Sequence, residues 1–370
     1  MRRGKVKMVF PGGNTCLGFY SFYDNIIGPD ANRVFVIKGG PGVGKSTFMR
    51  RIGEELRERG YDVEFHCCSS DNESLDAVVV PALGIALIDG TAPHVVDPKN
   101  PGAVDEIVNL GEFWDDAQLI RHRDEIVSLN KKVAEHFAVA YSNLRMAKIA
   151  RDEEASYRSE AFCYGRFNGL LGELLRTIFG ERLCWGEKEP EARHLFASAL
   201  TPGGIVHHLP TVLEEVESLY IVGGEPGSGA ELVLAEFLVY AFRSGFKMEV
   251  YHCAFDPAQV DLVVLPERRV AVIKVFPELA FEPASLPCMK VCEKFDTSSC
   301  IDAEKLADVS EELIRFRQIY SVCLERALQH IKMAKQVHDE MERYYVEAMD
   351  FDGIEEKRME ILRRILDYAR

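Results

Sequence analysis

The sequence has no long apolar run and no apolar stretch near its start that is typical of a signal peptide. Its most apolar segment, residues 77–88, contains Pro81 and is well short of the roughly 20 residues that a membrane-spanning helix needs. We therefore expect a cytoplasmic protein that does not cross a membrane.

Basic residues are also scarce relative to acidic ones, 44 against 59, which gives a net charge of -15. Such a surface repels phosphate backbones, so nucleic acid is not an expected partner. The ten cysteines include no CxxC pair, and the nearest approach, Cys288 and Cys292, favours free thiols over a zinc site. A chain of 370 residues with 47% apolar and 28% charged residues predicts a globular protein of two domains.

The chain repeats itself with an offset of 185 residues. Residues 34–51, VFVIKGGPGVGKSTFMRR, align without a gap with residues 219–236, LYIVGGEPGSGAELVLAE. Residues 60–89 align in the same way with residues 245–274, and the later segment 147–161 resembles the one that lies 187 residues further on. This common order indicates that a whole unit was duplicated.

Each copy is predicted to contain an α/β core with a parallel sheet, followed by a long helical arm. In the first copy, the apolar runs 34–38, 63–67 and 85–88 predict strands, and residues 45–59 predict a helix between the first two. Strand–helix–strand units build parallel sheets, whose ligands collect beyond the carboxyl ends of the strands. We therefore look for chemistry at that edge of each sheet.

The predicted division is two domains with one arm each: residues 1–189, with the arm at about 104–185, and residues 190–370, with the arm at about 302–370. In the second arm, apolar residues recur every three or four positions from Leu306 to Tyr344, which predicts a helix about 60 Å long. The pattern breaks at residues 350–353 and then resumes. Each arm is expected to form an antiparallel helical hairpin or an ordinary helical layer on its core, and a protein partner could bind through it.

The first copy contains a complete phosphate-binding loop. The residues expected to contact a nucleotide are Gly39, Gly40, Pro41, Gly42, Val43, Gly44, Lys45, Ser46 and Thr47. They match the pattern G-x-x-x-x-G-K-[ST] and stand between a predicted strand and a predicted helix. Glycines let the backbone amides turn toward an anion, Lys45 reaches the phosphates, and Ser46 is the expected magnesium ligand.

Acidic residues are expected beside this loop, because magnesium on a triphosphate needs a carboxylate directly or through water. Asp89 ends the apolar run GIALID and is the predicted second metal ligand and catalytic carboxylate. Asp71 follows another strand and could orient a water, contact magnesium or bind substrate, or it could cap a following helix. Asn14, Thr15, Thr91 and His94 also follow strands and are weaker candidates for the same edge.

The second copy keeps the bend of the loop and changes its chemistry. Ala230 replaces the lysine, Glu231 replaces the serine, and Lys274 stands where the first copy has Asp89. We expect this copy to have lost phosphate binding while retaining glycines for backbone geometry. We also expect Glu231 and Lys274 to pair across the empty site, in place of phosphate and magnesium.

The loop with its strand and helix resembles the P-loop NTPase superfamily. The duplicated layout, with IKGGPGVGKST and VVVPALGIALIDGTAPH, resembles a bacterial family of tandem P-loop ATPases whose second loop is degenerate. The resemblance implies binding of ATP and Mg²⁺. The chain has no N-K-x-D motif of the kind that reads guanine, so we expect ATP rather than GTP.

Three functions fit these motifs. The first is an ATP hydrolase or nucleotide switch that uses only the first loop, with Lys45, Asp89 and Asp71 as catalytic residues. The second is a kinase in which the arm of the first copy is a lid over a phosphoryl acceptor. The third is a nucleotide-binding scaffold without turnover.

Overall fold

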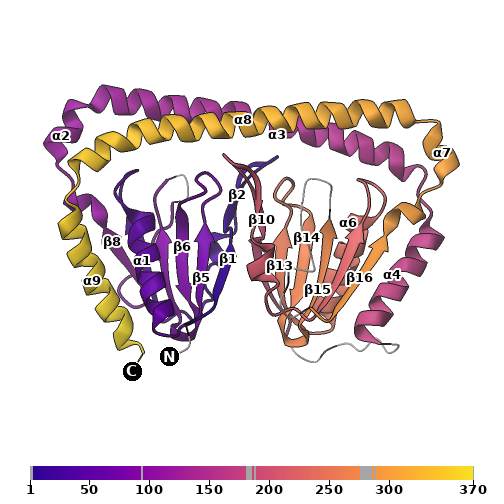
Figure 1. Ribbon diagram of the computed structural model, residues 1–370, viewed down its shortest axis with the longest axis horizontal. Helices are drawn as coiled ribbons and strands as arrows, with labels where there is room; N and C mark the ends of the chain where they lie inside the picture. Colours follow the sequence, from indigo (N-terminus) through magenta and orange to yellow (C-terminus); the bar gives the residue numbers. More distant parts are fainter. Residues whose placement is uncertain are drawn as a thin grey trace.

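Two six-stranded sheets stand side by side beneath a pair of long helices in the computed structural model (Figure 1). The structure describes residues 3–92, 95–180, 186, 189–275, 286 and 289–369. The first sheet comes from the first copy and the second sheet from the second copy, so the two predicted α/β cores are confirmed. Within the described ranges, no helix is both long and apolar enough to cross a membrane.

The first half contains eight strands and four α-helices. The strands are β1 (Val6–Val9), β2 (Gly12–Thr15), β3 (Gly18–Ser21), β4 (Arg33–Lys38), β5 (Val63–Cys67), β6 (Leu75–Val80), β7 (Ile85–Asp89) and β8 (Asp105–Asn109). The helices are α1 (Lys45–Glu58), α2 (Asp116–Arg121), α3 (Arg123–Ser159) and α4 (Tyr164–Phe179). The predicted strands and the helix after the loop are therefore present, within one or two residues of their expected ends.

The second half repeats this order. Its strands are β9 (Glu191–Phe196), β10 (Ser198–Thr201), β11 (Gly204–His207), β12 (Ser218–Gly223), β13 (Lys247–His252), β14 (Val260–Leu265), β15 (Val270–Val275) and β16 (Val291–Asp296). Its helices are α5 (Leu209–Val212), α6 (Ala230–Arg243), α7 (Ala303–Ala307), α8 (Ser310–Ala348) and α9 (Phe351–Asp367).

Both sheets have the same topology. Their orders are β1-β5-β6-β7-β4-β8 and β9-β13-β14-β15-β12-β16, position for position. The expectation of parallel sheets holds for most pairs, but β6 and β14 run antiparallel to both of their neighbours. Each follows the preceding strand through a short turn, which leaves no room for the crossover that a parallel connection requires. The central strands β4 and β12 are buried along four consecutive residues, as expected for strands that are covered on both faces.

The long helices α3 and α8 run antiparallel and span both halves (Figure 1). Their contact buries small and apolar side chains: Ala140, Leu144, Ala147 and Ala150 of α3, and Tyr320, Leu324, Ala327 and Ile331 of α8. Alanine at the contact lets two helix backbones approach closely. The predicted long helices are therefore confirmed, and each pairs with its counterpart from the other half.

Each arm starts in its own half and ends on the other one. The backbone N–H of Asp115 donates to the carbonyl of Ala348 at 2.8 Å, and Asp302 donates to Ala161 at the same distance. These two hydrogen bonds are related by the offset of 187 residues, so the exchange of arms follows the duplication. The short helices α4 and α9 come after the crossing and therefore lie against the opposite sheets.

The exchanged helices complete the cores that they reach. Ile354, Ile361, Leu362 and Ile365 of α9 belong to the same buried cluster as Met49 and Ile52 of α1. Phe167, Leu174 and Ile178 of α4 are likewise buried with Val233 and Phe237 of α6. Removing apolar area from water is the main favourable term in folding, so each half depends on the other for part of its core.

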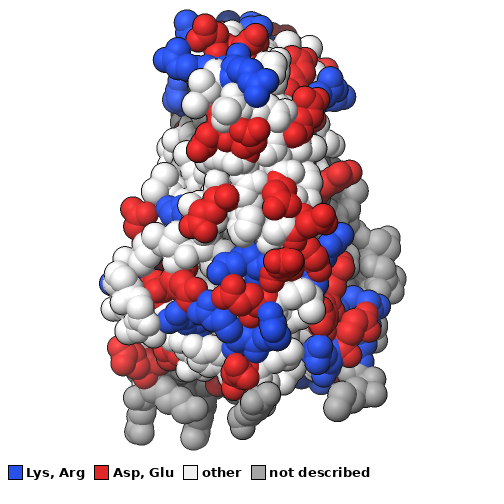
Figure 2. Space-filling model, turned by 90° about the vertical axis from the view of Figure 1, so that its left-hand side faces the viewer, with Lys and Arg blue, Asp and Glu red and all other residues white. Residues whose placement is uncertain are grey.

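Ion pairs also hold α9 against the first half. Arg364 donates from Nη1 to Oε1 of Glu106 at 2.8 Å, and Nη1 of Arg358 lies 3.5 Å from Oε2 of Glu55. Positive and negative side chains are interspersed over this end of the molecule (Figure 2). Mixed signs are consistent with local pairing rather than with a large field of one sign.

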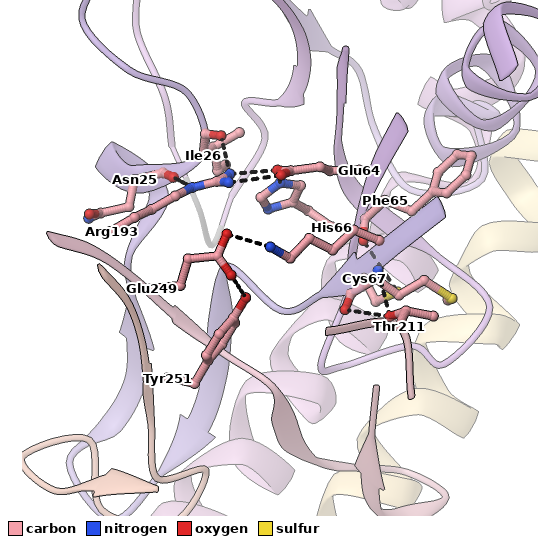
Figure 3. A network of polar contacts seen from close by, with 12 residues as sticks. Asn25, Ile26, Glu64, Phe65, His66, Cys67, Arg193, Thr211, Glu249 and Tyr251 are labelled. Carbon is pink, nitrogen blue, oxygen red and sulfur yellow. Dashed lines mark hydrogen bonds and ion pairs between the residues drawn. The ribbon is translucent and has the colours of Figure 1, made fainter. Parts of the chain in front are cut away.

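A buried polar network joins the halves below the long helices (Figure 3). Arg193 of β9 donates two hydrogen bonds to the Glu64 carboxylate of β5, at 2.9 and 2.7 Å, and two more to the carbonyls of Asn25 and Ile26. Burial raises the pKa of Glu64, but Arg193 and His66 outweigh it and lower the pKa below its usual range. The ionised carboxylate therefore belongs to the interface between halves.

The exchange of arms predicts that a substitution in α9 destabilises the first half. Ile361 is fully buried in the first core, so Ile361→Ala should lower the free energy of unfolding by about 2–5 kcal/mol. The exposed Glu356 on the same helix is the matched control, and Glu356→Ala should change it by less than about 0.5 kcal/mol. Hydrogen exchange should accelerate in α1 of the Ile361→Ala variant, and unchanged protection of α1 would contradict the packing described here.

Candidate functional site

The phosphate-binding loop connects β4 to α1 at the carboxyl edge of the first sheet. Gly42 and Gly44 have φ of 68° and 84°, a left-handed conformation that side chains with a β-carbon rarely adopt. Val43 between them is buried and anchors the loop in the core. The first turn of α1 has no side-chain cap and no acidic residue, so its free N–H groups and positive dipole end are available to an anion.

Lys45, the first residue of α1, folds back over the loop. Its Nζ donates to the carbonyls of Gly39 at 3.0 Å and Gly40 at 2.7 Å, and lies 3.7 Å from Oδ2 of Asp89. Its side chain is 11% exposed. The ammonium group is therefore held at the loop by neutral carbonyls, which an anionic ligand can replace as partners.

Asp89 ends β7, which lies directly beside β4. Its Oδ1 accepts a hydrogen bond from the N–H of Thr91 at 2.9 Å, and the Thr91 hydroxyl donates to the Gly39 carbonyl. Burial raises the pKa of Asp89, while the nearby Lys45 opposes that shift. The structure thus brings Lys45, Asp89 and Thr91 together at the loop.

Ser46 faces the start of β6 rather than open solvent. Its Oγ accepts a hydrogen bond from the N–H of Leu75 at 2.9 Å. Thr47, the next residue of the loop motif, is exposed on the first turn of α1. Ser46 is therefore tied to the strand that carries Asp76.

Asp71 lies in the turn between β5 and β6. It accepts hydrogen bonds from the N–H of Glu73 and the hydroxyl of Ser74, and β6 follows, so its predicted role as a helix cap is wrong. Lys335 of α8 lies 3.4 Å from Asp71, and Lys148 of α3 lies 3.5 Å from the counterpart Asp256. This contact occurs in both halves, which favours an attachment of the long helices to the sheets.

The weaker candidates separate into two groups. Asn14 is buried between the halves, where its amide donates to Ser69 and Leu200 and its oxygen accepts from Tyr141. Thr15 closes the β2–β3 turn through a hydrogen bond to Gly18. Both side chains stabilise the fold away from the loop, whereas Thr91 lies at it. His94 falls outside the described residues.

Asp76 is a residue of this site that the sequence motifs do not indicate. It is 4% exposed at the start of β6, next to Leu75 and across from the end of β7. Burial, together with the Asp89 carboxylate, raises the pKa of Asp76 to about 7. The alignment of the two copies pairs it with Asp261, and the replacement of Asp89 by Lys274 opposite that residue is the available signal.

The degenerate loop of the second half has the same backbone geometry, with φ of 81° at Gly227 and 108° at Gly229. Within the described part of the chain no ion pair joins Glu231 to Lys274, so the predicted pairing of these two residues is wrong. Lys274 instead lies 3.1 Å from Oδ1 of Asp261 and donates to Gln259 at 3.0 Å. Burial lowers the pKa of Lys274, but Asp261 outweighs it and the net shift is upward.

Glu231 occupies the first turn of α6, the helix end that attracts negative charge. An acidic residue is thus built into the position at which α1 is free to accept an anion. The second half therefore carries its own substitutes for both ions: a carboxylate at the helix end and an ammonium group at the end of β15.

Each loop is contacted by the long helix of the other half. A β-carbon on Gly42 would lie 2.8 Å from the carbonyl oxygen of Glu342 in α8, and one on Gly40 would lie 2.7 Å from the ring of Tyr345. At the degenerate loop the buried Arg158 of α3 donates to the carbonyl of Pro226. Tyr345 and Arg158 are related by the offset of 187, so an aromatic ring contacts the intact loop where a cation holds the degenerate one.

The largest cavity described, of about 530 Å³, lies elsewhere. It is formed between the halves at the amino ends of the parallel strands and is lined by Lys5, Tyr61, Glu215 and Arg269 among others. It contains neither the loop residues nor their counterparts. Geometry and charge at the loops, rather than cavity size, therefore identify the candidate site.

Comparison with known proteins gives one partial similarity. A family model described as Nephrocystin 3, N-terminal, matches residues 17–82, a segment that includes the loop, α1 and β5 and spans well under half of the chain. Neither the curated proteins nor the solved structures gave a significant match.

The buried pair in the second half predicts a large effect of Lys274→Ala. It leaves the Asp261 carboxylate in the core without its ammonium partner, so the free energy of unfolding should fall by about 3–5 kcal/mol. Glu231→Ala in the same loop removes only a helix-end interaction and should cost no more than about 1 kcal/mol. Urea unfolding measures both, and similar small losses would argue against a buried ion pair.

Proposed function

We propose that this protein binds ATP with Mg²⁺ at the first loop only, and acts as an Mg²⁺-dependent ATP hydrolase or nucleotide switch of the P-loop class. The observation that carries the proposal is the contrast between two loops of the same geometry. One has a free helix end with Lys45, Ser46 and Asp89 beside it, and the other has Glu231 and Lys274 in place of the two ions. The matched family model supports the proposal in so far as it spans the intact loop.

The residues around the intact loop fit magnesium. Ser46 and Asp89 offer a hydroxyl and a carboxylate, and hard oxygen donors of this kind suit Mg²⁺. Bound Mg²⁺ neutralises charge on the β and γ phosphates. Lys45 exchanges its two carbonyl partners for phosphate oxygens, and the N–H groups of the loop and of the first turn of α1 point at the anion.

The coupling to conformation runs through α8. Glu342 and Tyr345 contact the loop at Gly42 and Gly40, so a change of the loop on nucleotide binding acts on the helix that joins the halves. The arm of the first half ends on the second sheet, so α8, and not that arm, is the helix placed to cover a phosphoryl acceptor in a kinase. We favour a switch because α8 already packs against the loop.

Lys45→Ala should weaken ATP binding by roughly 1.5–3 kcal/mol, or about 10- to 150-fold, because it removes a charged donor to the phosphates. Isothermal titration should give one ATP per chain for the wild type. Glu231→Ala, the matched change in the degenerate loop, should leave ATP affinity unchanged.

Two equivalents of ATP per chain, or an unaltered affinity in Lys45→Ala, would contradict the proposal. Phosphate release without an acceptor supports the hydrolase or switch. ADP formation that depends on an added acceptor identifies a kinase instead, and ATP binding without turnover identifies a scaffold.

A further inference from the structure

The two halves place different charges at one equivalent position of their sheets. Ala77 of β6 pairs with Ile88 of β7, and Leu262 of β14 pairs with Ile273 of β15. The next position along the first ladder holds Asp76 opposite Asp89, and along the second ladder it holds Asp261 opposite Lys274. A carboxylate on the antiparallel strand is thus common to both halves, and only its partner changes sign.

In the second half this position is a complete ion pair. The Nζ of Lys274 lies 3.1 Å from Oδ1 of Asp261, and the two residues are 3% and 7% exposed. Buried charges are stable only when an opposite charge or hydrogen bonds compensate them. The ammonium group therefore marks a place in this fold where a positive charge fits between the two strands.

In the first half the same place has two carboxylates and no lysine. Asp76 is 4% exposed, and among the described residues its Oδ2 has no hydrogen-bond partner. Asp89 uses Oδ1 to accept from Thr91, and its Oδ2 faces Lys45 at 3.7 Å. An unpartnered carboxylate oxygen buried beside a second carboxylate is costly unless a cation lies between them.

Ser46 adds a third oxygen to this group. Its Oγ is held 2.9 Å from the N–H of Leu75, the residue that precedes Asp76. One hydroxyl and two carboxylates from α1, β6 and β7 form the set of hard oxygen donors that Mg²⁺ and Mn²⁺ prefer.

We propose that Asp76 and Asp89 together hold the divalent cation of the first half, and that the Lys274 ammonium group is the built-in replacement for this cation in the second half. The inference deepens the proposed function, because this is the cation that accompanies the triphosphate. Its new element is Asp76, which lies on β6 outside the loop motif. It also explains why Asp261 was retained when the second half lost its other site residues: without it Lys274 would be buried alone.

The experiment titrates nucleotide-free protein with Mn²⁺ and measures free Mn²⁺ by electron paramagnetic resonance. Wild-type protein should bind one Mn²⁺ per chain at this site. Asp76→Asn should weaken the binding by at least about tenfold, since even an outer partner of a metal ligand contributes that much. Asp261→Asn, the matched change in the second half, should leave Mn²⁺ affinity unaltered while lowering the melting temperature.

A second variant guards against loss of folding. Asp89→Lys copies the arrangement of the second half, so its ammonium group should pair with Asp76. It should abolish Mn²⁺ binding and leave the melting temperature in metal-free buffer at or above that of the wild type. A lower melting temperature or retained Mn²⁺ binding in Asp89→Lys would overturn the inference, as would wild-type protein that binds no Mn²⁺ or Asp76→Asn with wild-type affinity.

ATP titrations of the same proteins separate the two proposals. ATP binding by the wild type, combined with a Mn²⁺ affinity that does not depend on Asp76, overturns this inference alone. Mn²⁺ binding that depends on Asp76, without any ATP binding, overturns only the proposed nucleotide function.

Discussion

The exchange of helical arms is the constraint on which the rest of the structure depends. α3 and α8 each cross from one half to the other, and the shorter helices α4 and α9 then bury their apolar faces against the opposite sheets. Neither sheet covers its helix-bearing face with its own chain alone. The hydrophobic effect that stabilises each core therefore also fixes the position of the halves relative to each other.

This constraint gives the two loops unequal surroundings. α8 contacts the intact loop through Tyr345 and the backbone of Glu342, which carry no charge at the contact. α3 contacts the degenerate loop through the buried Arg158, which also pairs with Glu154. A buried arginine with several partners is costly to separate, so the degenerate side acts as a fixed support. The intact side lacks this clamp and is the side at which a ligand can alter the contact.

Much of the fold and part of the site could be predicted from the sequence. The strands around Val36 and Phe65, the helix that begins at Lys45, and the duplication are confirmed, because apolar runs and a glycine-rich turn are local patterns. Asp89 was placed beside the loop because strand ends of neighbouring parallel strands meet. The direct pairing of Glu231 with Lys274 was wrong, because the motif gives no information about Asp261 on the adjacent antiparallel strand.

The sequence by itself determined what each segment is. Its glycines specify the left-handed turns of both loops, Lys45 and Ser46 specify the chemistry of one of them, and apolar spacing specifies two long helices. The tertiary structure alone decided what each segment meets: which sheet α9 covers, which carboxylate Lys274 pairs with, and that Asp76 lies beside Asp89. The physical reason is that an apolar stripe or a buried charge requires a partner without naming it, and only the order of strands and the crossing of helices supplies that partner.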